Sequence, residues 1–161
     1  MTVRIIQADL ANPVHARALV EVLDAYARDI MGGGQALSPT TRANLATELG
    51  KRAGVHVWLA FDGEQAVGLA NCIEGFSSFA CKPLLNIHDL AVMPAARGQG
   101  IGRRLIERVV QQARELGCCK VTLEVLEGNA VAQSLYRATG FAGYALNAES
   151  GRAMFLQKLL D

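Results

Sequence analysis

Glycines and arginines cluster at residues 97–105, in the part of the sequence that points most directly to chemistry. The segment reads RGQGIGRRL and follows an apolar run typical of a strand. Small residues let a phosphate group approach the backbone, and the first N–H groups of a helix beginning there have no partner within that helix. The sequence therefore indicates a site for an anion such as a diphosphate. The alternative is a tight strand-to-helix turn that only needs glycine for its conformation.

The spacing of this segment excludes two familiar phosphate-binding motifs. Glycines at positions 98, 100 and 102 leave Arg103 where the dinucleotide motif G-x-G-x-x-G requires its third glycine. A P-loop beginning at Gly98 would need lysine at 104 and serine or threonine at 105, where the sequence has Arg104 and Leu105. Neither hydride transfer nor hydrolysis of a nucleoside triphosphate is indicated.

Two motifs together carry a family resemblance. Residues 88–106, HDLAVMPAARGQGIGRRLI, resemble the acetyl-coenzyme A signature R/Q-x-x-G-x-G/A of the GNAT superfamily of N-acetyltransferases, with Arg97, Gly100 and Gly102 at its defined positions. Residues 129–141, NAVAQSLYRATGF, resemble the second motif of the same superfamily. The resemblance implies an α/β (α+β) fold, in which helices flank a mixed, centrally splayed β-sheet. It is close over residues 84–144 and elsewhere rests on the order of the elements.

The resemblance also implies a donor site for acetyl-coenzyme A. The glycine-rich turn would hold the diphosphate with backbone N–H groups, and the end of the preceding strand would bind the pantetheine arm. On the last helix, positions 129, 132 and 136 share one face and would bond the arm, leave room for it and reach the thioester. The implied cofactor-binding residues are Leu90, Ala91, Val92, Arg97, Gly98, Gln99, Gly100, Ile101, Gly102, Arg103, Asn129, Ala132 and Tyr136.

Tyr136 is the expected general acid. Aminolysis of a thioester expels a thiolate, and a phenol with a reference pKa of about 10 can protonate it without being ionised at neutral pH. The alternative is a tyrosine packed in the core of an amphipathic helix. We expect direct transfer in a ternary complex, because holding two substrates close and oriented supplies a large rate factor without an acetyl-enzyme.

The general base is less determined. An acceptor amine with a pKa near 10 must lose a proton before it attacks. His88 is the first candidate, because imidazole titrates near neutral pH and a histidine in a similar position serves an arylalkylamine branch of the superfamily. Asp89 on the opposite strand face, Glu124 on the next strand and Glu74 on a hairpin are alternatives. A hydrogen-bonded structural histidine is the other interpretation of His88.

Hydrophobic periodicity predicts the elements that position these residues. The predicted helices begin at Asn12, Ser38, Gly100 and Asn129. The apolar stripe of the first helix is predicted to include Ile30, and the apolar stripe of the third helix is predicted to include Leu116. Strand, turn, helix and strand over residues 84–126 predict a right-handed βαβ unit with parallel strands. Strands are predicted at 2–8, 56–61, 65–74, 84–92 and 120–126, with a terminal hairpin of FAGYAL and RAMFLQKLL at 141–146 and 152–160.

The whole chain, residues 1–161, is predicted to be a single N-acetyltransferase domain. Gly32–Gly34 is interpreted as a flexible connection that could serve as a mobile loop on the substrate side. The acceptor pocket would be built by residues 27–52, 76–82 and the terminal hairpin. These segments carry no strong acidic cluster that would call for a polyamine or an aminoglycoside, so the primary amine of a small molecule, an amino acid or a peptide remains open.

Composition excludes several other classes of function. Hydrophobic residues make up 51% of the chain and charged residues 19%, which is typical of a folded globular protein. The net charge of +1 gives no general case for nucleic acid or an anionic membrane, and the arginines near position 100 lack interleaved aromatics. No apolar run is long enough to span a membrane and no signal peptide is recognised, so a cytoplasmic location is expected.

Three further questions stay open at this level. The four cysteines lack zinc-ligand spacing, so they are interpreted as structural thiols and no metal is expected, although a thiol beside a substrate pocket is an alternative. A non-catalytic sensor or interaction module that binds coenzyme A is the alternative function, and Tyr136 favours the enzyme over it. Superfamily members are often homodimers, which no feature of this sequence decides.

Overall fold

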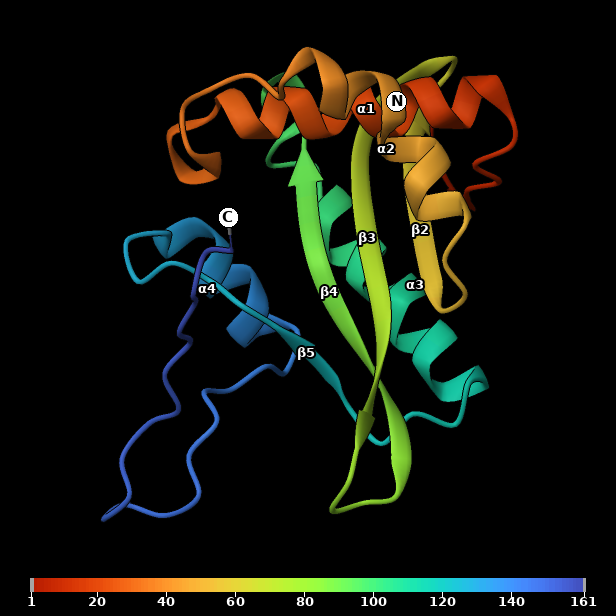
Figure 1. Ribbon diagram of the computed structural model, residues 1–161. Helices are drawn as coiled ribbons and strands as arrows, with labels where there is room; N and C mark the ends of the chain where they lie inside the picture. Colours follow the sequence, from red (N-terminus) through yellow and green to blue (C-terminus); the bar gives the residue numbers. More distant parts are fainter. Residues whose placement is uncertain (1, 161) are drawn as a thin grey trace. The chain divides into compact units, whose positions relative to one another are not determined.

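The computed structural model describes residues 2–160, and the chain divides after Leu123 into two compact units. The first unit holds a five-stranded sheet and three long helices, and the second holds one helix and the C-terminal segment (Figure 1). None of the described helices is long and apolar enough to cross a membrane. The organisation as a single domain stays a prediction.

The sheet of the first unit is mixed, as predicted. Its strands are hydrogen-bonded in the order of the sequence, and the first three pairs are antiparallel. The last pair is parallel and joined by a helix, which confirms the βαβ unit. The strands are β1 (Val3–Gln7), β2 (Val55–Asp62), β3 (Gln65–Ser77), β4 (Lys82–Val92) and β5 (Val121–Leu123).

Helices cover both faces of this sheet. On one face, α1 (Pro13–Arg28) buries Leu19 and Val22 against β2 and β3, and α2 (Pro39–Gly50) packs beside it. On the other face lies α3 (Ile101–Glu115), so close that a Cβ added at Gly68 of β3 would stand 3.2 Å from Leu105 Cδ1 (Figure 1). Each fully buried leucine or valine stabilises this packing by about 1.5–3 kcal/mol.

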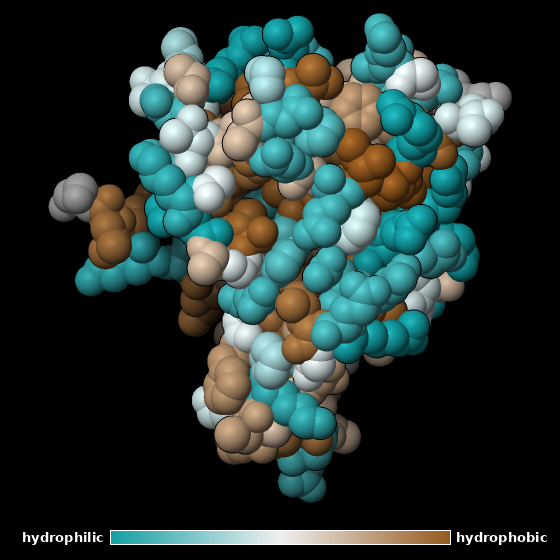
Figure 2. Space-filling model, turned by 90° about the vertical axis from the view of Figure 1, so that its right-hand side faces the viewer, coloured by the Kyte–Doolittle hydropathy of each residue, from teal (hydrophilic) through white to brown (hydrophobic). Residues whose placement is uncertain are grey.

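The helices of the first unit begin where the sequence predicts. The side chain of Asn12 accepts a hydrogen bond from Val14 N at 2.9 Å, and that of Ser38 accepts one from Thr41 N at 3.1 Å. In both helices a proline follows the cap, where its missing N–H costs nothing. Polar residues fill the outer helix faces, and Figure 2 shows hydrophilic side chains spread over most of the face in view, with smaller hydrophobic patches between them.

A β-bulge interrupts β4. Asn71 of β3 lies opposite Asp89, but the next residue, Cys72, lies opposite Ile87, so His88 is the additional residue of the bulge. Paired residues of antiparallel strands project to the same face. Strict alternation, which predicts that His88 shares a face with Leu90 and Val92, therefore does not hold through this point.

Register assigns the faces of β4 instead. Leu85 and Ile87 before the bulge project to the same face as Leu90 and Val92 after it, which is the face covered by α3. Asp89 projects to the opposite face, toward α1, as predicted.

Two residues predicted to lie on apolar helix stripes do not do so. Ile30 is 84% exposed, because α1 ends at Arg28 and the short 3-10 helix η1 (Ile30–Gly32) follows. Leu116 is the C-cap of α3 and only half-buried. Ile106, in the interior of the same helix, is 1% exposed and contributes to its buried face. Stripe predictions fail at helix ends, where the 3.6-residue period no longer applies.

The C-terminal half of the chain contains less strand than predicted. β5 ends at Leu123 rather than near residue 126. The predicted terminal hairpin is reduced to one antiparallel bridge between Ala145 and Arg152, beside a hydrogen bond from Ala153 N to Tyr144 O at 3.2 Å. A two-stranded hairpin is marginal unless its apolar face is packed, and Phe155 in this segment is 76% exposed.

Helix α4 (Ala130–Ala138) of the second unit forms where it was predicted. Asn129 is its N-cap, and its Oδ1 accepts a hydrogen bond from Ala132 N at 3.1 Å. Gly140 follows the helix with a φ of 92°, a left-handed conformation that ends helices and favours glycine.

Candidate functional site

The glycine-rich turn leaves the N-terminus of α3 open. β4 is followed by the short 3-10 helix η2 (Pro94–Ala96), then by Gly98 and Gly100 with φ values of 77° and 75°. Both values lie in the left-handed region, which explains glycine at these two positions. Helix α3 begins at Ile101, and no side chain in the described part of the chain caps it. Its first N–H groups are therefore available to an anion.

The edge of β4 that leads into this turn is also open. The parallel pairing with β5 covers Leu85 to Ile87, and within residues 2–160 no further strand pairs with that edge. Met93 N donates to Val67 O at 2.8 Å, so alternation directs the backbone groups of Leu90 and Val92 away from β3. An extended ligand bearing amide groups can add along this edge as a strand would.

Ala91 differs from its two neighbours in the predicted set. Its backbone groups point toward β3 by the same alternation, and its side chain is 6% exposed in the core below α1. Of the three strand residues predicted to bind the pantetheine arm, Leu90 and Val92 direct their backbone N–H groups to the open edge and Ala91 does not.

Arg97 connects the turn to the loop after α1. Its Nε donates to Val92 O at 3.2 Å, and its terminal guanidinium nitrogen donates to Asp29 Oδ2 at 2.9 Å. This contact joins residues that are 68 positions apart in the sequence. Arg103 lies exposed in the first turn of α3.

Asp29 organises the loop that contains the triple glycine. Its side chain accepts a hydrogen bond from Met31 N at 3.0 Å, and its carbonyl accepts bonds from Gly32 N and Gly34 N. The Met31 bond, followed by Arg97, lowers the pKa of the Asp29 carboxyl. Gly32 packs so tightly that a Cβ there would stand 1.9 Å from Tyr26 O. The predicted flexible connection is thus a hydrogen-bonded loop.

A buried polar pair lies on the α1 face of the sheet, beside the open edge. Asn71 is 3% exposed, and its Nδ2 donates to Asp89 Oδ2 at 2.9 Å. Its own Oδ1 is buried and has no hydrogen-bond partner among the residues that the structure describes. A buried unpaired group of this kind costs about 1–3 kcal/mol. Asn71 is not among the residues predicted from the sequence, although it is the one strongly polar side chain in the buried run AVGLANC at 66–72.

Tyr26 of α1 lies within electrostatic range of the same carboxylate. Burial raises the pKa of its phenol, and the negative charges of Asp89 and Asp29 raise it further. The hydroxyl donates to Met31 O at 3.5 Å, a long contact. Tyr26 therefore stays neutral at physiological pH and adds a polar, uncharged group to this face.

The structure separates the candidate bases. Asp89 is half-buried and held by Asn71, whereas His88 is exposed at the bulge. Glu74 projects to the α3 face, where its Oε1 lies 2.6 Å from His56 Nε2. Only Asp89 among the three lies on the α1 face with a buried partner.

The remaining predicted residues lie in the second unit. Tyr136 is half-buried on α4 and makes an edge-to-face contact with Phe141, with ring centroids 5.9 Å apart. Asn129 and Ala132 share its helix face, and Glu124 is exposed at the start of this unit.

Two of the cysteines, Cys72 and Cys118, have thiols whose pKa is raised. Burial, aided by the charge of Asp89, raises the pKa of Cys72 to about 12, and burial also raises that of Cys118. Raised values disfavour the nucleophilic thiolate. Across residues 2–160, no three or more His, Cys, Asp or Glu side chains are arranged to hold a metal ion.

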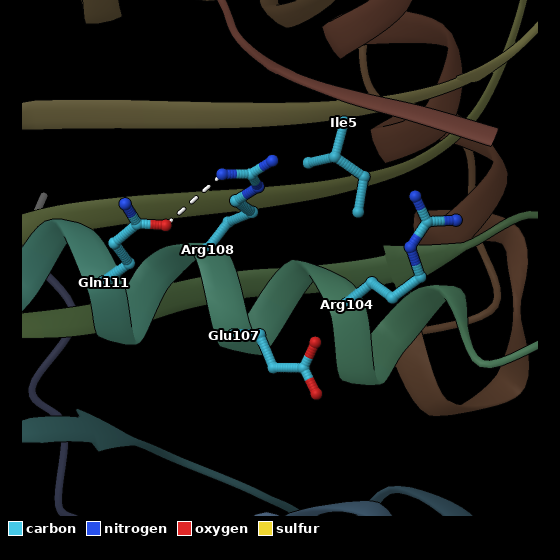
Figure 3. Close-up of a pocket in the computed structure, with 5 residues that line it drawn as sticks. All are labelled: Ile5, Arg104, Glu107, Arg108 and Gln111. Carbon is cyan, nitrogen blue, oxygen red and sulfur yellow. Dashed lines mark hydrogen bonds between the residues drawn. The ribbon is translucent and has the colours of Figure 1, made fainter.

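A cavity of about 260 Å³ lies elsewhere, between β1 and the outer face of α3 (Figure 3). Arg104, at its edge, donates to Val3 O at 2.8 Å, and Arg108 donates to Gln111 Oε1 at 3.3 Å. Ile5 and Glu107 complete the lining, which contains no predicted site residue. Charges of both signs line this groove. It is distinct from the glycine-rich turn, because no residue of the turn at 97–103 lines it.

Comparison with known proteins accords with this geometry. The chain is 41% identical over 80 residues to streptothricin acetyltransferase of Streptomyces lavendulae, covering 48% of this chain and 42% of that protein. It is 43% identical over 54 residues to thialysine N-epsilon-acetyltransferase of Bos taurus, covering 34% of this chain and 32% of that protein. The chain thus spans less than half the length of these curated relatives.

The fold is shared over nearly the whole chain. A crystal structure described as that of a probable acetyltransferase has a TM-score of 0.83 at 22% identity, covering 98% of this chain and 99% of that one. This likeness confirms the predicted fold class. The sequence profile of the acetyltransferase (GNAT) family matches residues 19–141, a range that includes the glycine-rich turn, the Asn71–Asp89 pair and α4. The chain therefore belongs to the acetyltransferase (GNAT) family.

Proposed function

We propose that this protein transfers an acetyl group from acetyl-coenzyme A to a primary amine of a small molecule, an amino acid or a peptide. The observation that carries the proposal is the uncapped N-terminus of α3 directly after the open edge of β4. The two features suit one ligand that combines a diphosphate with an extended arm of amides. The names of two relatives, which refer to streptothricin and thialysine, support an amine acceptor.

Donor binding would use mostly backbone groups of the first unit. The N–H groups of residues 98–103 would donate to the diphosphate, and those of Leu90 and Val92 would bond the arm. The bonds of Arg97 to Val92 and Asp29 use Nε and one terminal nitrogen of the guanidinium, so its other terminal nitrogen could donate to the diphosphate. On α4, the cap uses Asn129 Oδ1 and leaves its Nδ2 to donate to the arm.

Proton transfer would involve one base and one acid. Asp89 is the base we favour, because Asn71 orients it and it adjoins the open edge at Leu90. The acceptor ammonium gives a proton to this carboxylate, and the neutral nitrogen attacks the acetyl carbonyl carbon. The carbon–sulfur bond then breaks, and Tyr136 protonates the leaving thiolate. As the amide forms, the nitrogen releases its second proton to water, and the Tyr136 phenolate takes up a proton from water. Transfer is direct, and orientation of the two substrates supplies much of the rate.

The test is release of coenzyme A thiol from acetyl-coenzyme A in the presence of streptothricin, thialysine, lysine or glycylglycine. The expected result is amine-dependent thiol release, with one acetyl group added to the amine in the mass spectrum. Calorimetric titration with coenzyme A is run alongside. Tight binding of coenzyme A without transfer to any amine would overturn the enzymatic proposal and indicate the sensor function.

A further inference from the structure

Asn71 is a polar residue in a place where an apolar one would pack without penalty. It is 3% exposed in the middle of β3, and every other residue from Ala66 to Cys72 is buried and without a strongly polar side chain. Its Oδ1 has no partner within the described chain, so the amide is satisfied on one side only. A buried polar group that is incompletely satisfied calls for an explanation other than stability.

The partner on the satisfied side is Asp89. Asn71 Nδ2 donates to Asp89 Oδ2 at 2.9 Å, and because a carboxylate can only accept, this contact fixes which end of the amide faces it. One carboxylate oxygen is thereby held in place. The other, Oδ1, remains for a ligand.

The bulge in β4 creates this pair. Without the additional residue, His88 would lie opposite Asn71, and with it Asp89 takes that position. Asn71 of β3 is hydrogen-bonded to Asp89, and the charge of Asp89 also acts on Tyr26 of α1 and on Cys72 of β3. The bulge therefore brings a carboxylate, rather than an imidazole, to the amide beside the open edge of β4.

We infer that Asn71 is a positioning residue for acetyl transfer, acting through Asp89. By holding Oδ2, it directs Oδ1 toward the acceptor ammonium. The N–H bond of the ammonium breaks and its proton passes to Oδ1. The freed lone pair forms the carbon–nitrogen bond as the carbon–sulfur bond breaks, the thiolate takes the Tyr136 proton, and the nitrogen releases its second proton to water to give the amide. The inference rests on the proposed function and adds to it that the acceptor binds as a cation.

The variant that tests this is Asn71→Leu, which removes both the donor and the unpaired oxygen. We expect the melting temperature to stay the same or rise, because the buried unpaired Oδ1 is removed and the half-buried Asp89 carboxylate can accept a hydrogen bond from water in place of the lost donor. Calorimetric affinity for coenzyme A should stay within about twofold. With the panel amine that the wild-type protein acetylates fastest, kcat should fall by about tenfold or more. Stability and activity would then change in opposite directions, which a structural role does not produce.

Hydroxylamine supplies a second acceptor that is already uncharged at neutral pH. The nitrogen of hydroxylamine can attack without first giving a proton to a base. The Asn71→Leu variant should therefore acetylate hydroxylamine at a rate within about twofold of the wild-type rate. The matched control is Asn86→Leu, which removes a β4 amide that donates to Thr122 Oγ1 at 3.0 Å outside this pair. It should lower the melting temperature and leave kcat per folded molecule unchanged.

The outcomes separate this inference from the function on which it rests. A wild-type protein that acetylates neither the panel amines nor hydroxylamine overturns the proposed function, and the role of Asn71 with it. An active wild type with an Asn71→Leu variant of unchanged kcat overturns the inference alone. Loss of coenzyme A binding together with a lowered melting temperature in Asn71→Leu would show a structural role instead, which also overturns it.

Discussion

In the proposed reaction, side chains matter more for proton transfer than for binding of the donor. Backbone groups can hold the donor, so few side chains are needed there. In the proposed mechanism, proton transfer depends on particular atoms, namely Asp89 Oδ1 as the base and the Tyr136 hydroxyl as the acid. Tyr136 could be predicted as the acid from a sequence motif. The choice among the four candidate bases could not, because a strand pattern does not reveal hydrogen-bond partners or, where a bulge occurs, the face on which a side chain lies.

The Tyr136→Phe variant tests the acid. Removing the hydroxyl should lower kcat by about 100-fold, because a positioned general acid contributes about that much or more. The ring contact with Phe141 is retained, so the melting temperature should change little. Steady-state kinetics at saturating acetyl-coenzyme A measures the effect. Full turnover by this variant would remove Tyr136 from the mechanism.

At the scale of elements, two aspartates fasten the connection between α1 and α2. Asp24 Oδ1 accepts a hydrogen bond from Leu37 N at 2.8 Å, and Asp24 Oδ2 accepts one from Arg28. Asp29 holds Met31 N and Arg97 in the same way. The glycines of this connection led to the prediction that it is flexible. The hydrogen bonds that hold it join residues 13 and 68 positions apart, and such bonds cannot be inferred from composition.

These bonds predict how stability depends on pH. The Arg28 bond, followed by the Leu37 bond, lowers the pKa of Asp24, and the Met31 bond, followed by Arg97, lowers that of Asp29. A lowered folded-state pKa contributes stability that is complete above the unfolded value of about 3.9 and is lost as the pH falls through the lower folded value. Urea unfolding should therefore show stability decreasing below about pH 4.

The control for this prediction is the double variant Asp24→Asn, Asp29→Asn. It cannot titrate at these two positions, so its stability should depend less steeply on pH over the same range. Equal slopes for the two proteins would show that other carboxylates account for acid unfolding.

At the scale of the whole molecule, the predicted donor site draws on both units. The turn and the open edge of β4 belong to the first unit, and Asn129, Ala132 and Tyr136 belong to the second. The family profile spans both. A ligand that binds only the folded chain stabilises it by mass action, so donor binding can be measured as stability of the whole protein.

Coenzyme A at 100 times its dissociation constant should raise the free energy of unfolding by about 2.7 kcal/mol. Gly100→Ala should lose this gain, because a side chain there strains a backbone at φ 75° and obstructs the diphosphate. Gly63→Ala is the matched control: φ is 59°, it also has open space around it, and it lies in the β2–β3 turn. Thermal unfolding of both variants with and without coenzyme A measures the difference. Equal stabilisation of the two would place the diphosphate elsewhere.

The sequence by itself determined the elements with local causes. Prolines after Asn12 and Ser38, glycines at 98 and 100 and the 3.6-residue stripe of α3 act within a few residues of chain, so their consequences could be predicted. The two motifs likewise identified the family, because they consist of residue types at defined spacings. The terminal hairpin was wrong, since strand formation there depends on packing partners that a local pattern does not specify.

Only the tertiary structure determined which side chains contact each other. The bulge at His88 shifts the register of β4, so that Asp89 rather than His88 meets Asn71, and no local pattern in the sequence marks that shift. The contact between Arg97 and Asp29 likewise joins distant segments through the packing of α1 against the sheet. Chemistry that depends on residue type was legible in the sequence, whereas chemistry that depends on which two side chains meet required the folded chain.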